Sequence, residues 1–324
     1  MHAVTTVGER VVVDCPIPWL MSLLTDGTGG ELADAEAAGE SVRIEVQPSR
    51  QPFSREGWTL IGRDSWASGS GAILVDACSS GFDLQVEPHG EILHVAARYR
   101  PSPRTRAANF LLRRRFKLLA AQTLLHYPAL WWASARGRVP LHVSVTSDAG
   151  AVTMIAGPGG VGKSTLLCAG LARGEIATAD NICACDGNEA YGLAEPLRVT
   201  GGPGRATTLH GRREQPFPSR VPSLRPDRLV VLRRSAQAAG TRVGDASPAD
   251  AVRALVAGTY MAGELRRFWS FAATLALATG IGPVHPDVSG IATLLASRLP
   301  CIDVSVAHGS PVPISELLRP AGVR

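Results

Sequence analysis

The segment Gly157–Ser164 is the part of this chain whose residue types and spacing specify chemistry most directly. It reads Gly-Pro-Gly-Gly-Val-Gly-Lys-Ser, a complete G-x4-G-K-[ST] pattern. Glycines let a backbone turn tightly and point its N–H groups at a phosphate chain, and the lysine adds a compact positive charge. We expect Lys163 to reach the β- and γ-phosphates of a nucleotide and the Ser164 hydroxyl to hold Mg²⁺. The alternative is a glycine-rich turn that matches the pattern by chance.

The segments on either side of this phosphate loop favour the functional interpretation. Residues 151–156 have the composition of a short buried strand, and residues 165–171 have the apolar spacing of a helix. A strand, a glycine turn and a helix N-terminus in this order form an anion-binding site. The sequence therefore predicts a nucleoside triphosphate site whose contacts come from Gly157, Pro158, Gly159, Gly160, Val161, Gly162, Lys163, Ser164 and Thr165.

The use of lysine supports the same prediction. The chain contains 31 arginines and two lysines, Lys117 and Lys163. A compact ammonium fits between phosphates inside a tight backbone loop, where a planar guanidinium would not. A GC-rich genome accounts for the excess of arginine, but it does not account for the position of Lys163.

Length and charge indicate two domains of opposite character. A chain of 324 residues is long enough for about two hydrophobic cores. Residues 1–105 carry 8 basic and 14 acidic side chains, and residues 106–324 carry 25 basic and 14 acidic ones. The basic second part suits polyanionic ligands. It contains no nucleic-acid motif with interleaved aromatic residues, so nucleic acid is not expected as a partner.

Cysteine spacing and hydropathy indicate the cellular compartment. The six cysteines lack the paired spacing of a zinc site, and we expect free thiols in a reducing compartment. No apolar signal core follows Met1, and the longest apolar stretch, at residues 271–278, is too short to span a bilayer. The sequence therefore predicts a cytoplasmic protein without a membrane partner.

The pattern of elements changes after about residue 105. Short alternating runs separated by Gly, Pro, Ser and Asp predict a small, mainly antiparallel β domain over residues 1–105, followed by an extended linker at 100–104. Residues 106–324 alternate strands and helices, as in an α/β catalytic domain. Strands are expected at 141–145, 152–156, 176–180, 229–232 and 301–306. Helices are expected at 110–126, from 248 after an N-cap at Ser247, and at 263–278, 288–297 and 314–318.

Two basic segments are candidates for binding the acceptor of a reaction. Residues 201–226 are rich in proline and arginine and lack periodicity, so we expect a lid or substrate clamp. Arg205, Arg212 and Arg213 are its candidates for substrate binding. The cluster at residues 113–117 is either a solvated helix face or a docking surface for an acidic partner.

Phosphate-loop proteins commonly carry a second acidic residue at the end of a hydrophobic strand later in the chain. In this chain the most hydrophobic later strand does not end in an acid. That strand, 229–232, ends in Arg233-Arg234, whereas Asp180 follows the expected strand directly after the loop helix. The chain also lacks the NKxD-type signature of GTPases and the LSGGQ-type signature of transport ATPases. A carboxylate at a strand end beside the loop can accept a proton from a hydroxyl group.

This spacing resembles the catalytic domain of HPr kinase/phosphorylase. In that family a histidine opens the hairpin that leads to the phosphate loop, and an Ala-Asp-Asp element follows the loop helix. Here His142 lies fifteen residues before Gly157, and Ala179-Asp180-Asn181 occupies the second element. The resemblance implies an α/β phosphate-loop domain of the HPr-kinase/PEP-carboxykinase-like type. It also implies that Asp180 is the base and that His142 lies beside it, where it could tune Asp180 by hydrogen bonding.

The chain departs from the family at two places. Asn181 replaces the second acid, which argues against reversible phosphorolysis. The Glu-x-Arg-Gly-x-Gly signature is reduced to Glu195-Pro196-Leu197-Arg198, which leaves Glu195 as a candidate metal ligand. The N-terminal part and the run at residues 260–269 look more like the HPr-kinase-related kinases of peptide natural-product clusters, including those that tailor lasso peptides.

The sequence thus predicts a kinase that uses ATP and Mg²⁺ to phosphorylate a hydroxyl, most simply a serine of a peptide or small protein. Lys163, His142 and Asp180 are its expected catalytic residues. Two alternatives remain open. One is a nucleotide-binding regulator or scaffold without phosphotransfer, and the other is a small-molecule kinase, which would keep its activity without residues 1–105. A preference for ATP over GTP and a homo-oligomeric state are not specified.

Overall fold

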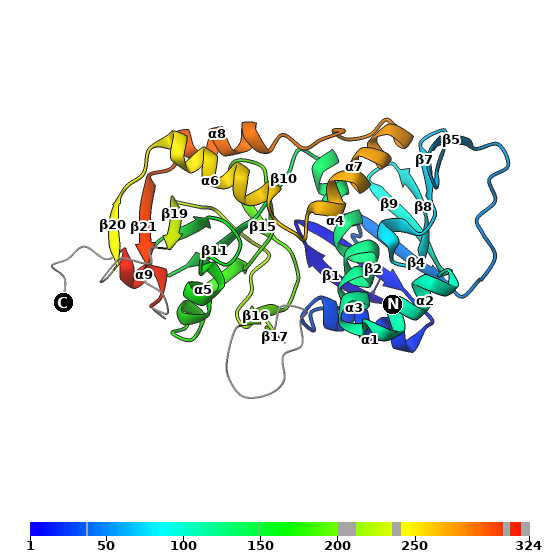
Figure 1. Cartoon of the computed structure of the whole chain (residues 1–324), viewed down its shortest axis with the longest axis horizontal. Coiled ribbons are helices and arrows are strands. Elements are labelled where there is room, and N and C mark those ends of the chain that lie inside the picture. The colour runs from blue at the N-terminus through cyan, green and yellow to red at the C-terminus, as the bar shows by residue number, and fades with distance from the viewer. Residues whose placement is uncertain (37, 149, 200–211, 235–240, 307–311, 319–324) are drawn as a thin grey trace. The chain divides into compact units, whose positions relative to one another are not determined.

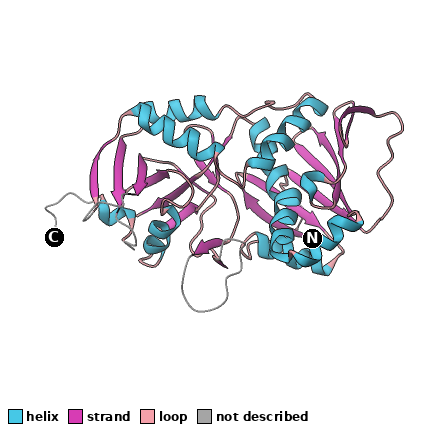
Figure 2. Cartoon of the chain, in the orientation of Figure 1, coloured by secondary structure: helices cyan, strands magenta, loops and turns pink. Residues whose placement is uncertain are grey.

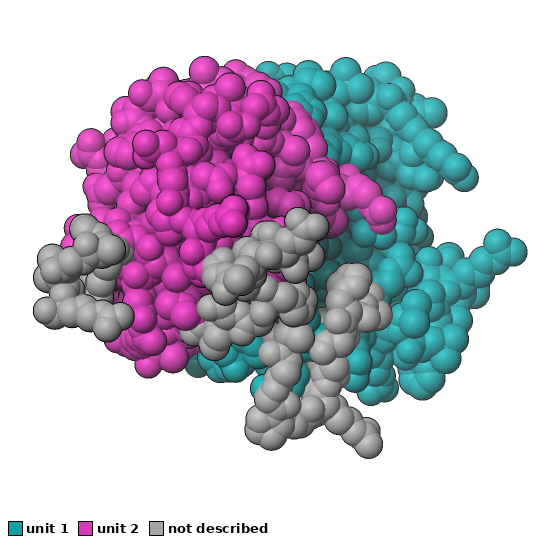
Figure 3. All heavy atoms as spheres, turned by 60° about the vertical axis from the view of Figure 1, so that its left-hand side comes forward, with its two compact units in different colours: residues 1–137, 194–216, 267–286 teal, residues 138–193, 217–266, 287–324 magenta. Residues whose placement is uncertain are grey.

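The computed structural model describes residues 1–36, 38–148, 150–199, 212–234, 241–306 and 312–318. Its contacts divide the chain into two compact units, coloured separately in Figure 3. Unit 1 comprises Met1–Gly137, Ala194–Pro216 and Arg267–Pro286, and unit 2 comprises Arg138–Leu193, Phe217–Arg266 and Asp287–Arg324. This division differs from the expected boundary after residue 105, because residues 106–137 and two later segments belong to the same compact unit as the N-terminal part.

Unit 1 is built on a nine-stranded sheet with the order β3-β1-β2-β4-β9-β8-β7-β6-β5. Its strands are β1 (His2–Thr6), β2 (Glu9–Asp14), β3 (Ala33–Asp34), β4 (Val42–Gln47), β5 (Thr59–Gly62), β6 (Ser65–Ser68), β7 (Gly71–Leu74), β8 (Phe82–His89) and β9 (Ile92–Tyr99). β4 pairs in parallel with β2 and β9, and the other neighbours are antiparallel. The sheet is therefore mainly antiparallel, as the alternating runs predicted.

The helices of unit 1 pack on this sheet (Figure 2). They are α1 (Pro18–Gly27), α2 (Pro103–Leu111), α3 (Arg113–Ala121), α4 (Tyr127–Ala135) and α7 (Arg266–Thr279), with a 3-10 turn at Ala77–Ser79 and a π-helical turn at Gln122–His126. β16 (Leu197–Val199) and β17 (Arg213–Gln215) form a separate two-stranded sheet. Phe116 on α3 stacks on Phe82, and Tyr127 contacts Phe268 and Phe271 of α7. These aromatic contacts join segments that are distant in the sequence.

Two expectations for unit 1 were wrong. Residues 100–104 are not an extended linker throughout, because the Ser102 hydroxyl accepts a hydrogen bond from the Thr105 N–H at 3.1 Å and caps α2, which begins at Pro103. The single helix expected over residues 110–126 is divided at Leu112, whose φ of −111° and ψ of 53° are not helical. After α3 the chain continues through the π-helical turn into α4.

Unit 2 contains a six-stranded sheet with the order β13-β11-β12-β19-β21-β20. Its strands are β11 (Val143–Ser147), β12 (Val152–Ala156), β13 (Ile176–Ala179), β19 (Arg228–Arg234), β20 (Arg242–Asp245) and β21 (Cys301–Val306). β12, β19 and β21 are mutually parallel, and the remaining pairs are antiparallel. The strands expected at 152–156 and 301–306 are confirmed. This unit has a mixed α/β architecture.

Helices cover both faces of this sheet. α6 (Pro248–Tyr260) and α8 (Val288–Arg298) lie on one face, and α5 (Lys163–Leu171) and α9 (Ile314–Leu317) lie on the other (Figure 1). The Ser247 hydroxyl accepts from the Asp250 N–H at 3.1 Å, which confirms the expected N-cap of α6. A smaller sheet joins β10 (Val139–Leu141), β14 (Cys183–Cys185), β15 (Ala190–Gly192) and β18 (Ser223–Leu224).

Two further expectations concern thiols and membranes. All six cysteines lie in the described part of the chain and are free thiols, with Cys183 and Cys185 buried on β14. Among the described residues, no helix is both long enough and apolar enough to cross a lipid bilayer.

Candidate functional site

The phosphate loop leaves the sheet of unit 2 at the end of β12. This strand lies between β11 and β19, and the side chains of Met154, Ile155 and Ala156 are completely buried. The loop therefore begins at the carboxyl end of an interior strand that is parallel to β19. In open α/β sheets, ligands bind beyond the carboxyl ends of such strands.

Two glycines of the loop are required by its shape. Gly157 has a φ of +153°, and a Cβ atom at this position would lie 2.8 Å from the Leu232 carbonyl oxygen. Gly162, with a φ of +116°, precedes the first residue of α5. Residues with side chains rarely adopt positive φ values. The pattern of glycines therefore reflects the backbone geometry of the loop itself.

Lys163 lies across the loop. Its side chain is buried, and its Nζ donates to the carbonyl oxygens of Gly157 at 2.8 Å and Pro158 at 3.2 Å. These contacts hold the ammonium group at the loop. Ser164 and Thr165 follow on the first turn of α5, where backbone N–H groups have no acceptor within their own helix. Charge and N–H donors therefore gather at one place, which suits a polyphosphate.

Asp180 follows the last residue of β13, the strand that pairs with β11. Its side chain is 4% exposed, and its backbone carbonyl accepts a hydrogen bond from the Ser144 hydroxyl of β11. Burial and, to a smaller extent, the negative charge of Asp180 raise the pKa of Cys168 on α5 to about 11. The Asp180 carboxylate therefore lies within electrostatic reach of the loop helix.

His142 lies between β10 and β11 and contacts the residue after Asp180. Its backbone N–H donates to Thr259 Oγ1 at 3.1 Å, and its Nε2 is 2.9 Å from Asn181 Oδ1. In this arrangement Nε2–H donates to the amide oxygen. The ring of His142 is thus hydrogen-bonded to the residue that follows Asp180. The Asn181 Nδ2 is buried and has no hydrogen-bond partner within the part of the chain that the structure describes.

The surroundings of His142 keep its ring neutral. Burial, followed by repulsion from the Lys163 ammonium, lowers the His142 pKa to about 4, and Glu264, Asn181 and the Gly258 backbone oppose this shift. A neutral imidazole beside Lys163 does not add to the positive charge of the loop. His142, Lys163, Asp180 and Asn181 thus belong to one buried polar cluster at the phosphate loop.

The expected metal and substrate residues outside this cluster lie elsewhere in the chain. Glu195, Arg212 and Arg213 belong to unit 1, and Arg205 lies outside the described residues. The Glu195 carboxylate is buried and lies 3.0 Å from Arg198 Nη2, so a cation already balances its charge. In the described ranges, no three His, Cys, Asp or Glu side chains gather as metal ligands. Within unit 2, the Ser164 hydroxyl on the first turn of α5 is the candidate metal ligand.

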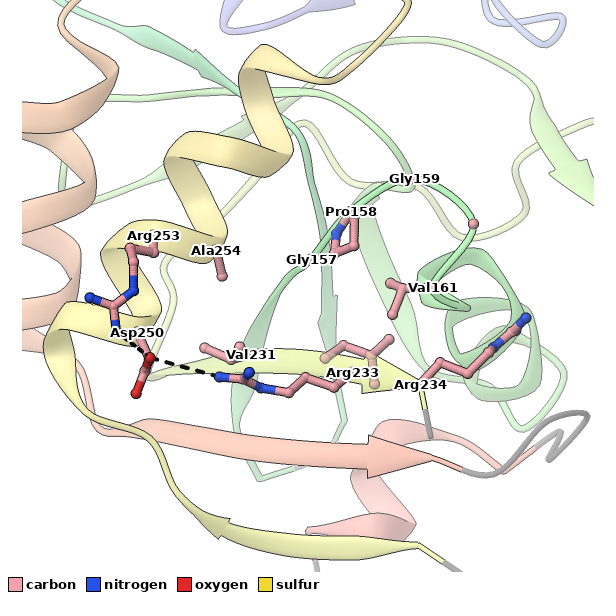
Figure 4. Close-up of a pocket in the computed structure, with 12 residues that line it drawn as sticks. Gly157, Pro158, Gly159, Val161, Val231, Arg233, Arg234, Asp250, Arg253 and Ala254 are labelled. Carbon is pink, nitrogen blue, oxygen red and sulfur yellow. Dashed lines mark hydrogen bonds and ion pairs between the residues drawn. The ribbon is translucent and has the colours of Figure 1, made fainter. Parts of the chain in front are cut away.

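A pocket that the sequence did not predict lies on the side of the loop that faces β19. It has a volume of about 530 Å³ and lies between Gly157–Val161, the end of β19 and the first half of α6 (Figure 4). Its polar side chains are Arg233, Arg234, Asp250 and Arg253. The one sequence signal for this pocket is Arg233-Arg234, the pair of arginines that follows the expected strand 229–232.

No protein-family model matches this chain, and no curated protein matches it. The geometry of unit 2 therefore carries the functional interpretation. Its loop can hold a phosphate chain, its cluster offers one carboxylate and one neutral imidazole, and both are partly shielded from water. This combination suits transfer of a phosphoryl group.

Proposed function

We propose that this chain is an ATP- and Mg²⁺-dependent kinase that phosphorylates a hydroxyl group, with a serine of a peptide or small protein as its acceptor. One observation carries the proposal. Lys163 lies across a complete phosphate loop, and the same loop is flanked by the buried Asp180 and by the His142–Asn181 pair. Burying a carboxylate costs free energy, so the presence of Asp180 in a buried position beside the loop favours a chemical role for it.

The residues of the loop fit the nucleotide and its metal ion. Loop N–H groups and Lys163 would hold the β- and γ-phosphates, and the Ser164 hydroxyl would be the protein ligand of Mg²⁺. The glycine conformations fit a loop that backbone alone must line, since a Cβ at Gly157 would meet the Leu232 carbonyl oxygen. The metal would supply charge neutralisation on the phosphates.

Asp180 would act as the base in the transfer step. Its carboxylate takes the proton of the acceptor hydroxyl while the hydroxyl oxygen forms a bond to the γ-phosphorus. The bond between that phosphorus and the β–γ bridging oxygen breaks, and ADP leaves with the electron pair. Asn181 would donate its buried amide N–H group to the oxygen atoms of the transferring group or of the acceptor. His142 would fix the orientation of that amide.

The proposal includes a relationship and a cellular context. The spacing of His142, the loop and Asp180 supports a kinase related to HPr kinase, of the kind that modifies ribosomal peptides in the cytoplasm. The acceptor would be recognised partly by positive charge, for which Arg205, Arg212 and Arg213 are the proposed contacts. A substituted arginine pair, Arg212→Ala with Arg213→Ala, should then raise the KM for an acidic peptide and leave that for ATP unchanged.

The test is phosphate transfer measured by mass spectrometry after incubation with ATP, Mg²⁺ and candidate peptides. Lys163→Ala and Asp180→Asn should each lower transfer at least a hundredfold, which is the usual scale for lost charge stabilisation or a lost base. Asp287→Asn is the matched control, because it exchanges the same groups at the N-cap of α8, where asparagine also caps well. Full transfer by Asp180→Asn would overturn the assigned role.

Two observations favour a second function. Asn181 occupies the place of a second acid, and the described residues offer no cluster of metal-binding carboxylates. A nucleotide-binding regulator that uses ATP as a switch would need neither a second acid nor a cluster of metal-binding carboxylates. Binding or slow hydrolysis is compatible with both functions, and only transfer to an acceptor separates them. If ATP binds tightly and no acceptor is ever modified, the regulator replaces the kinase.

A further inference from the structure

The phosphate loop has two different flanks. β12 pairs with β11 on one side and with β19 on the other. His142 precedes β11, and Asp180 follows β13, the strand beyond β11. The pocket lies on the β19 side, where the last residues of that strand face Gly157–Val161. The buried acid and the pocket therefore lie on opposite sides of the same loop.

A bound nucleotide has to extend across both flanks. The phosphoryl group that is transferred must approach Asp180, so the rest of the nucleotide extends toward β19. The pocket of about 530 Å³ on that side is within the usual size of small-molecule sites, about 300 to 1,000 Å³. Its lining combines the apolar side chains of Val231, Leu232 and Ala254 with charged groups. This composition suits a nucleoside with an attached phosphate.

Two of the three arginines in the pocket are already engaged by acids. Arg233 Nε lies 2.6 Å from Asp303 Oδ2, and its Nη2 lies 3.9 Å from Asp250 Oδ1. Arg253 Nη2 lies 2.5 Å from the same oxygen of Asp250. These ion pairs lie at one end of the pocket, and the two made by Asp250 are the dashed lines in Figure 4.

Arg234 is arranged differently. Its side chain points away from Asp250 in Figure 4, and within the described residues it forms no hydrogen bond or ion pair. A Cβ atom placed on Gly162 would lie 3.5 Å from Arg234 Nη2, so the guanidinium reaches the backbone of the loop directly before Lys163. A second cation thus approaches the loop from the flank opposite Asp180.

We propose that Arg234 and its pocket bind the part of the nucleotide that is not transferred, with the guanidinium on the phosphate that stays attached to the nucleoside. This inference rests on the proposed nucleotide site. The end of β19 carries arginine where an acidic metal ligand would be expected. In this proposal that arginine supplies positive charge to the phosphate chain. A planar guanidinium can donate two parallel hydrogen bonds to a phosphate.

Calorimetric titration with ADP and with ATP tests the inference. Arg234→Ala should weaken both nucleotides by the same factor, about tenfold for an exposed charge-assisted contact. Arg234→Lys should recover part of that loss. Arg242→Ala is the matched control, because Arg242 is an exposed arginine of unit 2 on β20 and does not line the pocket. We expect its affinity to change less than twofold, and thermal melts should show that each variant is folded.

Each outcome separates this inference from the proposed function. If the parent protein binds ADP and Arg234→Ala binds it equally well, the Arg234 subsite is wrong and the kinase proposal is unaffected. A loss confined to ATP would place Arg234 at the transferred phosphate and also overturn the inference. A parent protein that binds neither nucleotide would overturn both proposals, whereas Arg234-dependent binding without transfer to any acceptor would support the subsite and contradict the kinase.

Discussion

At the scale of single residues, the phosphate loop could be predicted from the sequence and the His142–Asn181 contact could not. The loop is local, because its chemistry follows from eight consecutive residues and the backbone they require. The contact joins residues 39 positions apart and depends on how β11 and β13 are aligned, with an irregular register between Val145 and Thr146. Spacing placed His142 near Asp180, but only the folded chain shows which atom the ring contacts.

The His142–Asn181 contact makes a prediction for Asn181→Asp. A carboxylate at the position of Asn181 Oδ1, 2.9 Å from Nε2, would favour the imidazolium form and raise the His142 pKa from about 4 by one unit or more. NMR titration of the imidazole resonance measures this shift. Asn188→Asp is the control, because Asn188 is exposed in a turn and should leave the titration of His142 unchanged. An unaltered pKa in Asn181→Asp would show that the contact is absent in solution.

At the scale of elements, local burial patterns and helix caps predicted strands and helix starts correctly, whereas prolines were compatible with both an extended segment and a helix start. The buried run 152–156 and the Ser247-Pro248 start of α6 were predicted, because burial pattern and capping chemistry are local. Residues 100–104 contain two prolines and were interpreted as extended. The same residues also contain a serine before a proline, a helix-start signal, and the structure follows that signal in α2. Tertiary packing on the sheet of unit 1 decides between the two.

The packing of α6 against the loop makes a prediction for Gly258→Ala. A Cβ on Gly258 would lie 3.1 Å from the Gly157 carbonyl oxygen, and Gly157 is itself held against the Leu232 carbonyl. Alanine gains about 1 kcal/mol of helix propensity, but overpacking against fixed backbone costs about 1 to 3 kcal/mol. We expect a small net loss of stability and weaker ADP binding, measured by thermal melts and titration. Gly263→Ala, with open space around its added methyl, should change neither; equal behaviour of the two variants would contradict the packing argument.

At the scale of the whole molecule, the units are interleaved along the chain. Unit 1 takes residues 194–216 and 267–286 as well as 1–137, so its core is completed after unit 2 has begun. α4 packs against β2 and β4, and the side chain of Trp131 on α4 is completely buried. Removal of residues 1–105 would expose this core, so residues 106–324 are not expected to fold as an independent domain. Charge and composition suggested a boundary near residue 105 but could not show which later segments return. Small-molecule and peptide kinases must therefore be distinguished with the full chain.

Two buried histidines, one in each unit, make the last prediction. Burial, followed by the charge of Arg198, lowers the pKa of His126 in unit 1 to about 4, and the His142 pKa in unit 2 is also about 4. Between pH 6.5 and 4 the unfolded chain binds protons at these rings and the folded chain does not. Above about pH 6.5 the two rings therefore have no effect on the free energy of unfolding. As the pH drops toward 4, the free energy of unfolding falls by up to about 3 kcal/mol for each ring. Urea unfolding from pH 7 to pH 4 measures the slope. His126→Gln and His142→Gln should each flatten it over that range and leave the slope above pH 7 unchanged, whereas a slope identical to the parent's would show that the rings are protonated in the folded protein.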